Sequence, residues 1–143
     1  MIKAVNLGKQ IVVTVVNKIG VLADMSRLTA EHGINIQAVA GYASGNEAKI
    51  MLVTDDNLRA SEALRKAGYK SLKEEEVVIV DLEDKPGALK IVTSDLAKEG
   101  IDIKQLYGTT CASGCPAKIV LSTSNNEKAL LVFNSVGKYK TLS

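Results

Sequence analysis

The sequence contains four tyrosines, one phenylalanine and no tryptophan, so it offers few rings on which nucleic-acid bases could stack. Lysine and arginine total 18 and aspartate and glutamate total 16, and the resulting charge of +2 is spread along the chain. A nucleic-acid-binding domain usually carries a concentrated basic patch, which this pattern lacks. We therefore expect no nucleic acid among the partners.

Long apolar runs and most catalytic signatures are also missing. No run approaches the roughly 20 apolar residues of a membrane-spanning helix. Lys3, Asn6 and Lys9 interrupt the N-terminal residues where a signal peptide would be continuously apolar. No phosphate-binding or dinucleotide-binding fingerprint occurs, and the single histidine, His32, has no evident nucleophile partner. These features predict a cytoplasmic protein that binds no membrane, is not an enzyme and needs no cofactor.

The sequence contains the same pattern twice. Asn-Lys-Ile-Gly-Val-Leu at residues 17–22 precedes His-Gly-Ile-Asn-Ile at residues 32–36, and Asp-Lys-Pro-Gly-Ala-Leu at residues 84–89 precedes Glu-Gly-Ile-Asp-Ile at residues 99–103. Only two copies indicate a duplicated small domain, because a solenoid needs about three or more units. We predict one domain over residues 1–74 and a second over residues 75–143.

Within each copy, the apolar spacing alternates between that of strands and that of helices. Glycines mark helix ends, since Gly33 and Gly68 stand where a left-handed C-cap is expected. The first copy is predicted to contain strand 10–16, a helix from residue 21, strands 35–43 and 48–54, a helix ending at residue 67 and a strand from residue 69. The second is predicted to contain strand 77–82, helix 88–99, strands 102–109 and 118–123, helix 127–136 and strand 138–142. The fold class is therefore predicted to be α+β, with two ferredoxin-like βαββαβ units whose antiparallel sheets carry helices on one face.

A glycine stands at the first strand-to-helix junction of each copy, at Gly20 and Gly87. The first N–H groups of a helix have no partner within it, and the helix dipole favours an anion there. An α-carboxylate of a free amino acid would fit such a site. The plainer interpretation is that each glycine only permits a tight turn.

Polar residues flank both junctions. Asn17 could accept a hydrogen bond from an ammonium group, and Asp84 could do so more strongly because its carboxylate is charged. Asn35 and Asp102 begin the following strand in each copy and would add a polar group to the same pocket. The alternative is that these residues only cap or turn the backbone.

Together, Asn-Lys-Ile-Gly-Val-Leu with Gly-Ile-Asn-Ile, and Asp-Lys-Pro-Gly-Ala-Leu with Gly-Ile-Asp-Ile, resemble two tandem ACT domains over essentially the whole chain. The resemblance implies regulatory binding of small ligands, usually amino acids, at interfaces between ACT units. The implied ligand-binding residues are Asn17, Lys18, Ile19, Gly20, Val21, Leu22, Asn35 and Ile36 in the first copy, and Asp84, Pro86, Gly87, Ala88, Leu89, Asp102 and Ile103 in the second.

One position departs from the serine-sensing version of that family. That version carries a histidine five residues before the glycine, where this sequence has Val15 and Leu82. The departure leaves the identity of the ligand open and favours an apolar contact at this point.

The only cysteines, Cys111 and Cys115, lie in a hairpin loop that is longer than its counterpart in the first copy. A structural zinc ion needs four ligands, and no histidine lies near the loop. The spacing also differs from that of a redox C-x-x-C motif. A reversible disulfide is one interpretation, and two reduced thiols are the other.

These observations favour a regulatory protein that binds an amino acid and thereby alters its assembly or its binding to a regulated enzyme or regulator protein. A homodimer is expected because the units leave sheet edges uncovered. The alternatives are an oligomerisation module without a ligand and, more remotely, a redox or metal protein that uses the cysteine loop.

Overall fold

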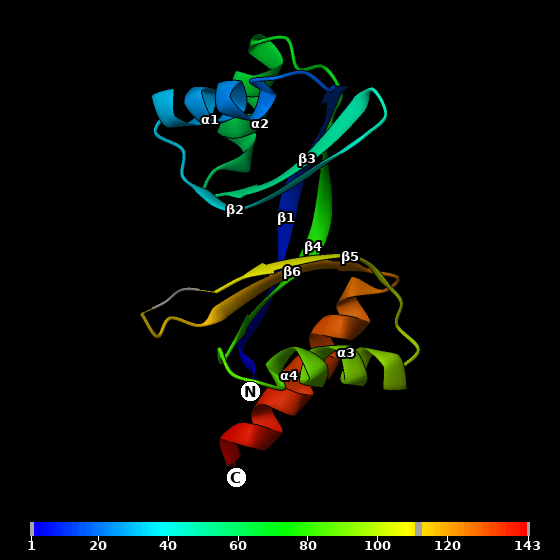
Figure 1. Cartoon of the computed structure of the whole chain (residues 1–143). Coiled ribbons are helices and arrows are strands. Elements are labelled where there is room, and N and C mark those ends of the chain that lie inside the picture. The colour runs from blue at the N-terminus through cyan, green and yellow to red at the C-terminus, as the bar shows by residue number, and fades with distance from the viewer. Residues whose placement is uncertain (1, 111–112, 143) are drawn as a thin grey trace. The chain divides into compact units, whose positions relative to one another are not determined.

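The computed structural model describes residues 2–110 and 113–142. The elements follow one another as β1 (Ile2–Val16), α1 (Val21–Glu31), β2 (Ile36–Ser44), β3 (Glu47–Thr54), α2 (Asn57–Lys66), β4 (Leu72–Leu82), α3 (Ala88–Lys98), β5 (Ile103–Thr109), β6 (Ala117–Thr123) and α4 (Asn126–Leu142) (Figure 1). The pairs β1–β3, β2–β3, β4–β6 and β5–β6 are all antiparallel. The α+β class and the antiparallel βαββ order of each copy are confirmed. None of the described helices is both long and apolar enough to cross a membrane.

The chain divides into two compact units, but not at the predicted boundary between residues 74 and 75. The first unit comprises residues 9–75, and the second comprises residues 76–142 together with residues 2–8. Both β1 and β4 therefore contain residues of each unit. The N-terminal residues belong with the later part of the chain because their apolar side chains complete its core. Ile2 is buried there beside Val78 and Phe133.

The predicted last strand, residues 138–142, is wrong. These residues continue α4, which runs to Leu142. In the first unit, Gly68 (φ +103°) ends the helical segment that contains α2, and the chain then returns as β4. In the second unit, the N-terminal part of β1 supplies core side chains instead, so the terminal segment is not needed as a strand. A helix satisfies its backbone groups locally.

The first unit has its core between α1, α2 and one face of its sheet (Figure 1). Ile11 and Val13 alternate toward this core from β1 because successive strand residues face opposite sides. Met25 and Leu64, from α1 and α2, are fully buried against them. The side chain of Asp56 caps α2 by accepting a hydrogen bond from the N–H of Arg59 (3.1 Å).

The second unit repeats this arrangement with α3 and α4 on its sheet (Figure 1). Val78, Val80 and Leu82 alternate inward from β4, and Leu96 and Phe133 from the helices are fully buried over them. The two cores thus place α1 and α3, with the glycine loops that precede them, at equivalent positions of their units.

Candidate functional site

The glycine loops have nearly the same backbone geometry in both units. Gly20 has φ +93° and ψ 0° immediately before α1, and Gly87 has φ +89° and ψ −8° immediately before α3. Among the described residues, no side chain caps either helix start. A Cβ atom built on either glycine would meet none of their atoms within 4 Å. Both loops therefore turn through the left-handed region and border open space.

A hollow of about 350 Å³ lies beside the loop of the first unit. Its lining combines the start of α1 with the segment that follows α2: Lys18, Ile19, Gly20, Val21, Asp24, Ala67, Gly68 and Tyr69. Among the residues predicted from the sequence, Lys18, Ile19, Gly20 and Val21 line it. Asn17, Leu22, Asn35 and Ile36 do not.

The strongest polar feature of this hollow is the pair formed by Asp24 and Tyr69. The Tyr69 hydroxyl donates a hydrogen bond to Oδ2 of Asp24 (2.5 Å), and the Arg27 guanidinium donates one to Oδ1 (2.7 Å). These two hydrogen bonds, that of Tyr69 first, hold the pKa of Asp24 below its usual value. Burial, and then the bond to Asp24, raise the pKa of Tyr69 to about 12. At neutral pH the hollow therefore contains a fixed carboxylate close to the start of a helix.

A larger hollow of about 470 Å³ lies beside the loop of the second unit. Its lining comes from the loop, the start of α3 and strands β5 and β6: Leu82, Asp84, Lys85, Ala88, Leu89, Leu106, Gly108, Thr109, Thr110, Ala117 and Ile119. Asp84, Ala88 and Leu89 were predicted from the sequence. Pro86, Gly87, Asp102 and Ile103 were predicted too but do not line the hollow.

Two charged residues stand at the loop of this larger hollow. Asp84 is exposed and forms no ion pair or side-chain hydrogen bond with the residues that the structure describes. Lys85, by contrast, is paired with Glu83 at 2.8 Å, and its hydrogen bond lowers the pKa of the Glu83 carboxyl. The carboxylate of Asp84 is thus available to a cation, whereas Lys85 already has an anionic partner.

The backbone groups of Asn35 and Asp102 are held by hydrogen bonds in both units. The N–H of Asn35 donates to the Asp55 carboxylate (3.0 Å), and the N–H of Asp102 donates to the Ser124 hydroxyl (2.9 Å). Their carbonyls accept from the N–H groups of Asp55 and Ser124. Both residues close the backbone at the ends of the central hairpins, and contact of their side chains with a ligand stays a prediction.

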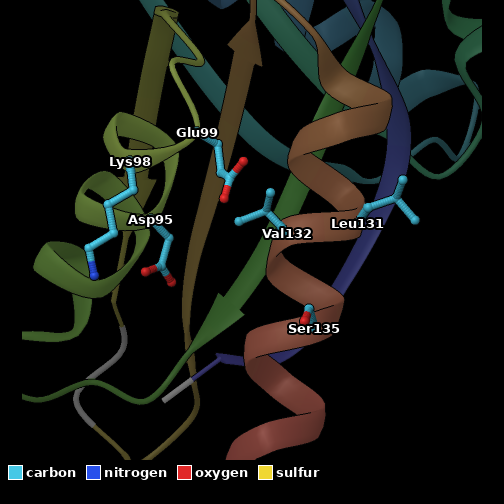
Figure 2. Close-up of a pocket in the computed structure, with 6 residues that line it drawn as sticks. All are labelled: Asp95, Lys98, Glu99, Leu131, Val132 and Ser135. Atoms are coloured by element: carbon cyan, nitrogen blue, oxygen red, sulfur yellow. The ribbon is translucent and has the colours of Figure 1, made fainter.

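A third hollow, of about 330 Å³, lies between α3 and α4 of the second unit and was not predicted (Figure 2). It is lined by Asp95, Lys98, Glu99, Leu131, Val132 and Ser135. The Oδ2 atom of Asp95 is buried and has no hydrogen-bond partner among the side chains that the structure describes. A buried oxygen left without a partner costs free energy of folding.

Only one of the two cysteines lies among the described residues, since Cys111 falls outside them. The predicted redox or metal chemistry of Cys111 and Cys115 therefore stays open. Cys115 is disulfide-bonded. Within the described ranges, no group of three or more His, Cys, Asp and Glu residues is placed to hold a metal ion.

Sequence signals for Asp24, Tyr69 and the strand residues of the larger hollow were weak. Asp24 follows Gly20 by about one helical turn, which places it near the loop, but Tyr69 lies far along the chain. Leu106 and Ile119 carry the ordinary pattern of core residues. Only the folded unit brings these side chains to the glycine loops.

A family model described as an ACT domain pair matches residues 5–137. None of the curated proteins compared with the chain matches it. Among solved structures, protein BT0572 from Bacteroides thetaiotaomicron has a TM-score of 0.84 at 24% identity, with 92% of this chain and 89% of that chain covered.

Two further solved structures belong to aspartate kinases. The ligand-free regulatory subunit of aspartate kinase from Thermus thermophilus has a TM-score of 0.66 at 16% identity, with 94% of this chain and 97% of that chain covered. Aspartokinase III of E. coli, in complex with lysine and aspartate, has a TM-score of 0.54 at 20% identity, with 94% of this chain and 32% of that chain covered. At these identities the likenesses establish the fold.

Proposed function

Because the chain belongs to the ACT domain pair family, we propose that it is a regulatory protein without enzymatic activity that binds a free amino acid beside its glycine loops. Binding would alter its self-assembly or its attachment to a partner protein, either a regulated enzyme or a regulator. The protein would act in the cytoplasm as a homodimer, and the ligand would also contact an ACT unit of the second copy.

The observation that carries this proposal is the repeated geometry at Gly20 and Gly87. Both glycines have positive φ, start a helix without a side-chain cap and border open space. A hollow with a carboxylate accompanies each loop, with Asp24 in the first unit and Asp84 in the second. A turn that only reverses the chain needs neither a hollow nor a carboxylate.

The charges of these hollows complement those of an α-amino acid. The N–H groups in the first turn of α1 favour an anion because they lack partners within the helix. Asp84 would pair with the ammonium group in the second unit, and Asp24 would do so in the first through the acceptor positions that its hydrogen bonds to Tyr69 and Arg27 leave free. Hydrogen bonds from Tyr69 and Arg27 keep Asp24 ionised, which suits it to this role.

The proposed regulation follows from the thermodynamic linkage between ligand binding and assembly. A ligand shifts an equilibrium between two assembly states only when it binds one of them more tightly. A ligand that contacts two chains meets this condition, because its complete site exists only in the assembled state. The two aspartate kinase relatives give this proposal a precedent, since one is named a regulatory subunit and the other was solved with lysine and aspartate.

The competing proposal is an oligomerisation module whose glycine loops serve only as turns. The disulfide of Cys115 gives a redox role a single supporting observation. Several apolar side chains of the first unit, Val16, Ile19, Val39 and Tyr42, are exposed and would be available to an assembly contact under either proposal.

The decisive experiment measures thermal unfolding and isothermal titration of the full chain with each of the twenty amino acids at millimolar concentration. At least one amino acid should raise the melting temperature and bind with a measurable heat. Asp24→Asn and Asp84→Asn identify the occupied hollow, since each removes one carboxylate charge with little change in shape. If no amino acid binds or stabilises the chain, the sensing function is rejected and the oligomerisation module is retained.

A further inference from the structure

We infer that the larger hollow, beside Gly87, selects an amino acid with an aliphatic side chain of about the size of valine, leucine or methionine. This inference rests on the proposed function and names the ligand class for one of its two sites. It arises from strand residues of the second unit that lie outside the glycine-loop pattern.

The floor of the larger hollow is apolar. Leu82, Ala117 and Ile119 are 2%, 7% and 8% exposed, and the partly buried Leu106 and the more exposed Leu89 border the same space. At Gly108, an added Cβ would lie 2.5 Å from Cδ1 of Ile119, so the isoleucine side chain takes the place that another residue would fill. The surface presented to a ligand here is hydrocarbon.

A hydrocarbon floor discriminates between ligand side chains. A serine hydroxyl or a lysine ammonium lying on it would lose hydrogen bonds to water and find no replacement. An aliphatic side chain would instead be removed from water against the leucine and isoleucine side chains. Each additional methylene group in such a pocket increases affinity by roughly tenfold or more.

The charges at the loop orient the ligand without favouring a charged side chain. Asp84 is a carboxylate without an ion pair among the described residues, so it can take the α-ammonium group. Lys85 is held by Glu83 at 2.8 Å, so it offers little to an acidic ligand side chain. Thr110 also lines the hollow and has a hydroxyl that can donate to the α-carboxylate, whereas the hydroxyl of Thr109 donates to the carbonyl of Thr110 (3.4 Å).

The hollow of the first unit provides the contrast within the same chain. It measures about 350 Å³ against about 470 Å³, and Lys18, Asp24 and Tyr69 are among its lining residues. Because its lining is more polar, this hollow would add little binding free energy for a long aliphatic side chain. The two sites therefore differ in ligand class although their glycine backbones agree.

The test is isothermal titration of the full chain with L-leucine, L-valine, L-serine, L-lysine and L-aspartate. Leucine should bind at least tenfold more tightly than serine, lysine or aspartate. 4-Methylpentanoate, which keeps the leucine side chain but has no ammonium group, should bind at least tenfold more weakly than leucine.

Two variants locate the bound leucine. Leu106→Ser should weaken leucine binding at least tenfold, whereas Val39→Ser, at the equivalent position of the first unit, should leave it within twofold. Asp84→Asn, at an exposed residue, should weaken leucine binding at least fivefold without changing the melting temperature of the free protein. This second variant tests the site even if Leu106→Ser fails to fold.

The results distinguish failure of the aliphatic selectivity from failure of the proposed amino-acid-binding function. If no amino acid binds, both the selectivity and the function are rejected. Serine, lysine or aspartate binding as tightly as leucine, with that binding weakened by Asp84→Asn, rejects the inference and supports the amino-acid function. Loss of leucine binding in Asp24→Asn but not in Asp84→Asn also rejects the inference, because it places leucine in the hollow of the first unit.

Discussion

The two units share a backbone and differ in the side chains that surround it. Gly20 and Gly87 have φ values within a few degrees of each other. Beside the first lies the network of Asp24, Tyr69 and Arg27, whereas beside the second lies an apolar floor. The loop backbone is thus nearly the same in the two units, whereas the side chains around it differ. Under the proposed function, the backbone would fix where the ligand binds and the side chains would select which ligand.

The helix pairs show the same divergence. Leu28 of α1 packs against the core of the first unit. At the equivalent position of α3, the second unit has Asp95, which borders the hollow between α3 and α4 and has a buried oxygen without a partner among the described side chains (Figure 2). The same position therefore carries a hydrocarbon side chain in one unit and a carboxylate beside a hollow in the other.

The largest expected effect tests the assignment of residues 2–8 to the second unit. Ile2→Asp places an unpaired charge in that core, where Ile2 is only 5% exposed, and should destabilise the second unit by about 3 kcal/mol or more. Hydrogen exchange should show lost protection in β5, β6 and α4, with β2 and β3 much less affected. Lys3→Asp, at an exposed neighbour, is the control and should change stability little. Loss of protection confined to the first unit would contradict the division of the chain.

The next effect concerns the difference between Leu28 and Asp95. Asp95→Leu replaces a buried, unpaired oxygen by the residue of the first unit and should stabilise the protein by about 1–3 kcal/mol. Chemical denaturation of both proteins measures the change. Lys98→Leu, at an exposed residue lining the same hollow, controls for added hydrophobicity. If Asp95→Leu is neutral or destabilising, the oxygen has a partner in solution.

A smaller effect tests the equality of the two glycine backbones. Gly20→Ala and Gly87→Ala force alanine into the left-handed region, which costs about 1–2 kcal/mol. Because the added Cβ meets no neighbour at either site, the two losses should agree closely when measured by urea denaturation. Unequal losses would indicate that one loop adopts another backbone conformation in solution.

The smallest effect is the pH dependence of stability that Asp24 contributes in the first unit. The pKa of Asp24 is lowered on folding, so its contribution to stability is present above the unfolded value, about 3.9, and is lost as the pH falls through the folded value. Tyr69→Phe removes the first cause of this shift and should raise the pKa of Asp24. NMR titration of the carboxyl carbon reports this change, and Tyr107→Phe, in the second unit, should leave it unaltered. An unchanged pKa in Tyr69→Phe would contradict the Tyr69 hydrogen bond.

Local features of the fold were predictable from the sequence because they depend on nearby residues. Gly33 has φ +68° and Gly68 has φ +103°, and each follows a helix as its position indicated. The short apolar run at residues 77–82, rich in β-branched side chains, likewise predicted a strand. Capping and alternation are set within a few residues, so a single sequence contains them.

Features that depend on distant partners were not predictable. The likeness of residues 139–142 to residues 69–72 favoured a final strand, but the N-terminal residues complete that core and the segment remains helical. The residues of the candidate site also divide into those set by local sequence and those that depend on distant partners. Gly20 and Gly87 were found from their local pattern, whereas Tyr69 and Leu106 join the hollows only through the fold.

Residues 2–8 are synthesised before almost every residue against which they pack. Their core partners, from Val78 to Phe133, leave the ribosome much later. The first unit, residues 9–75, has no such delay, because all of its strands are contiguous in the chain. The second unit must therefore join two segments separated by residues 9–75 before the N-terminal part of β1 can pack, which slows its folding relative to the first. During synthesis, the apolar side chains of residues 2–8 stay exposed to solvent until the second unit has been made. A chaperone or a fused tag that covers these residues would therefore disturb folding of the second unit rather than of the first, which follows them directly in the chain.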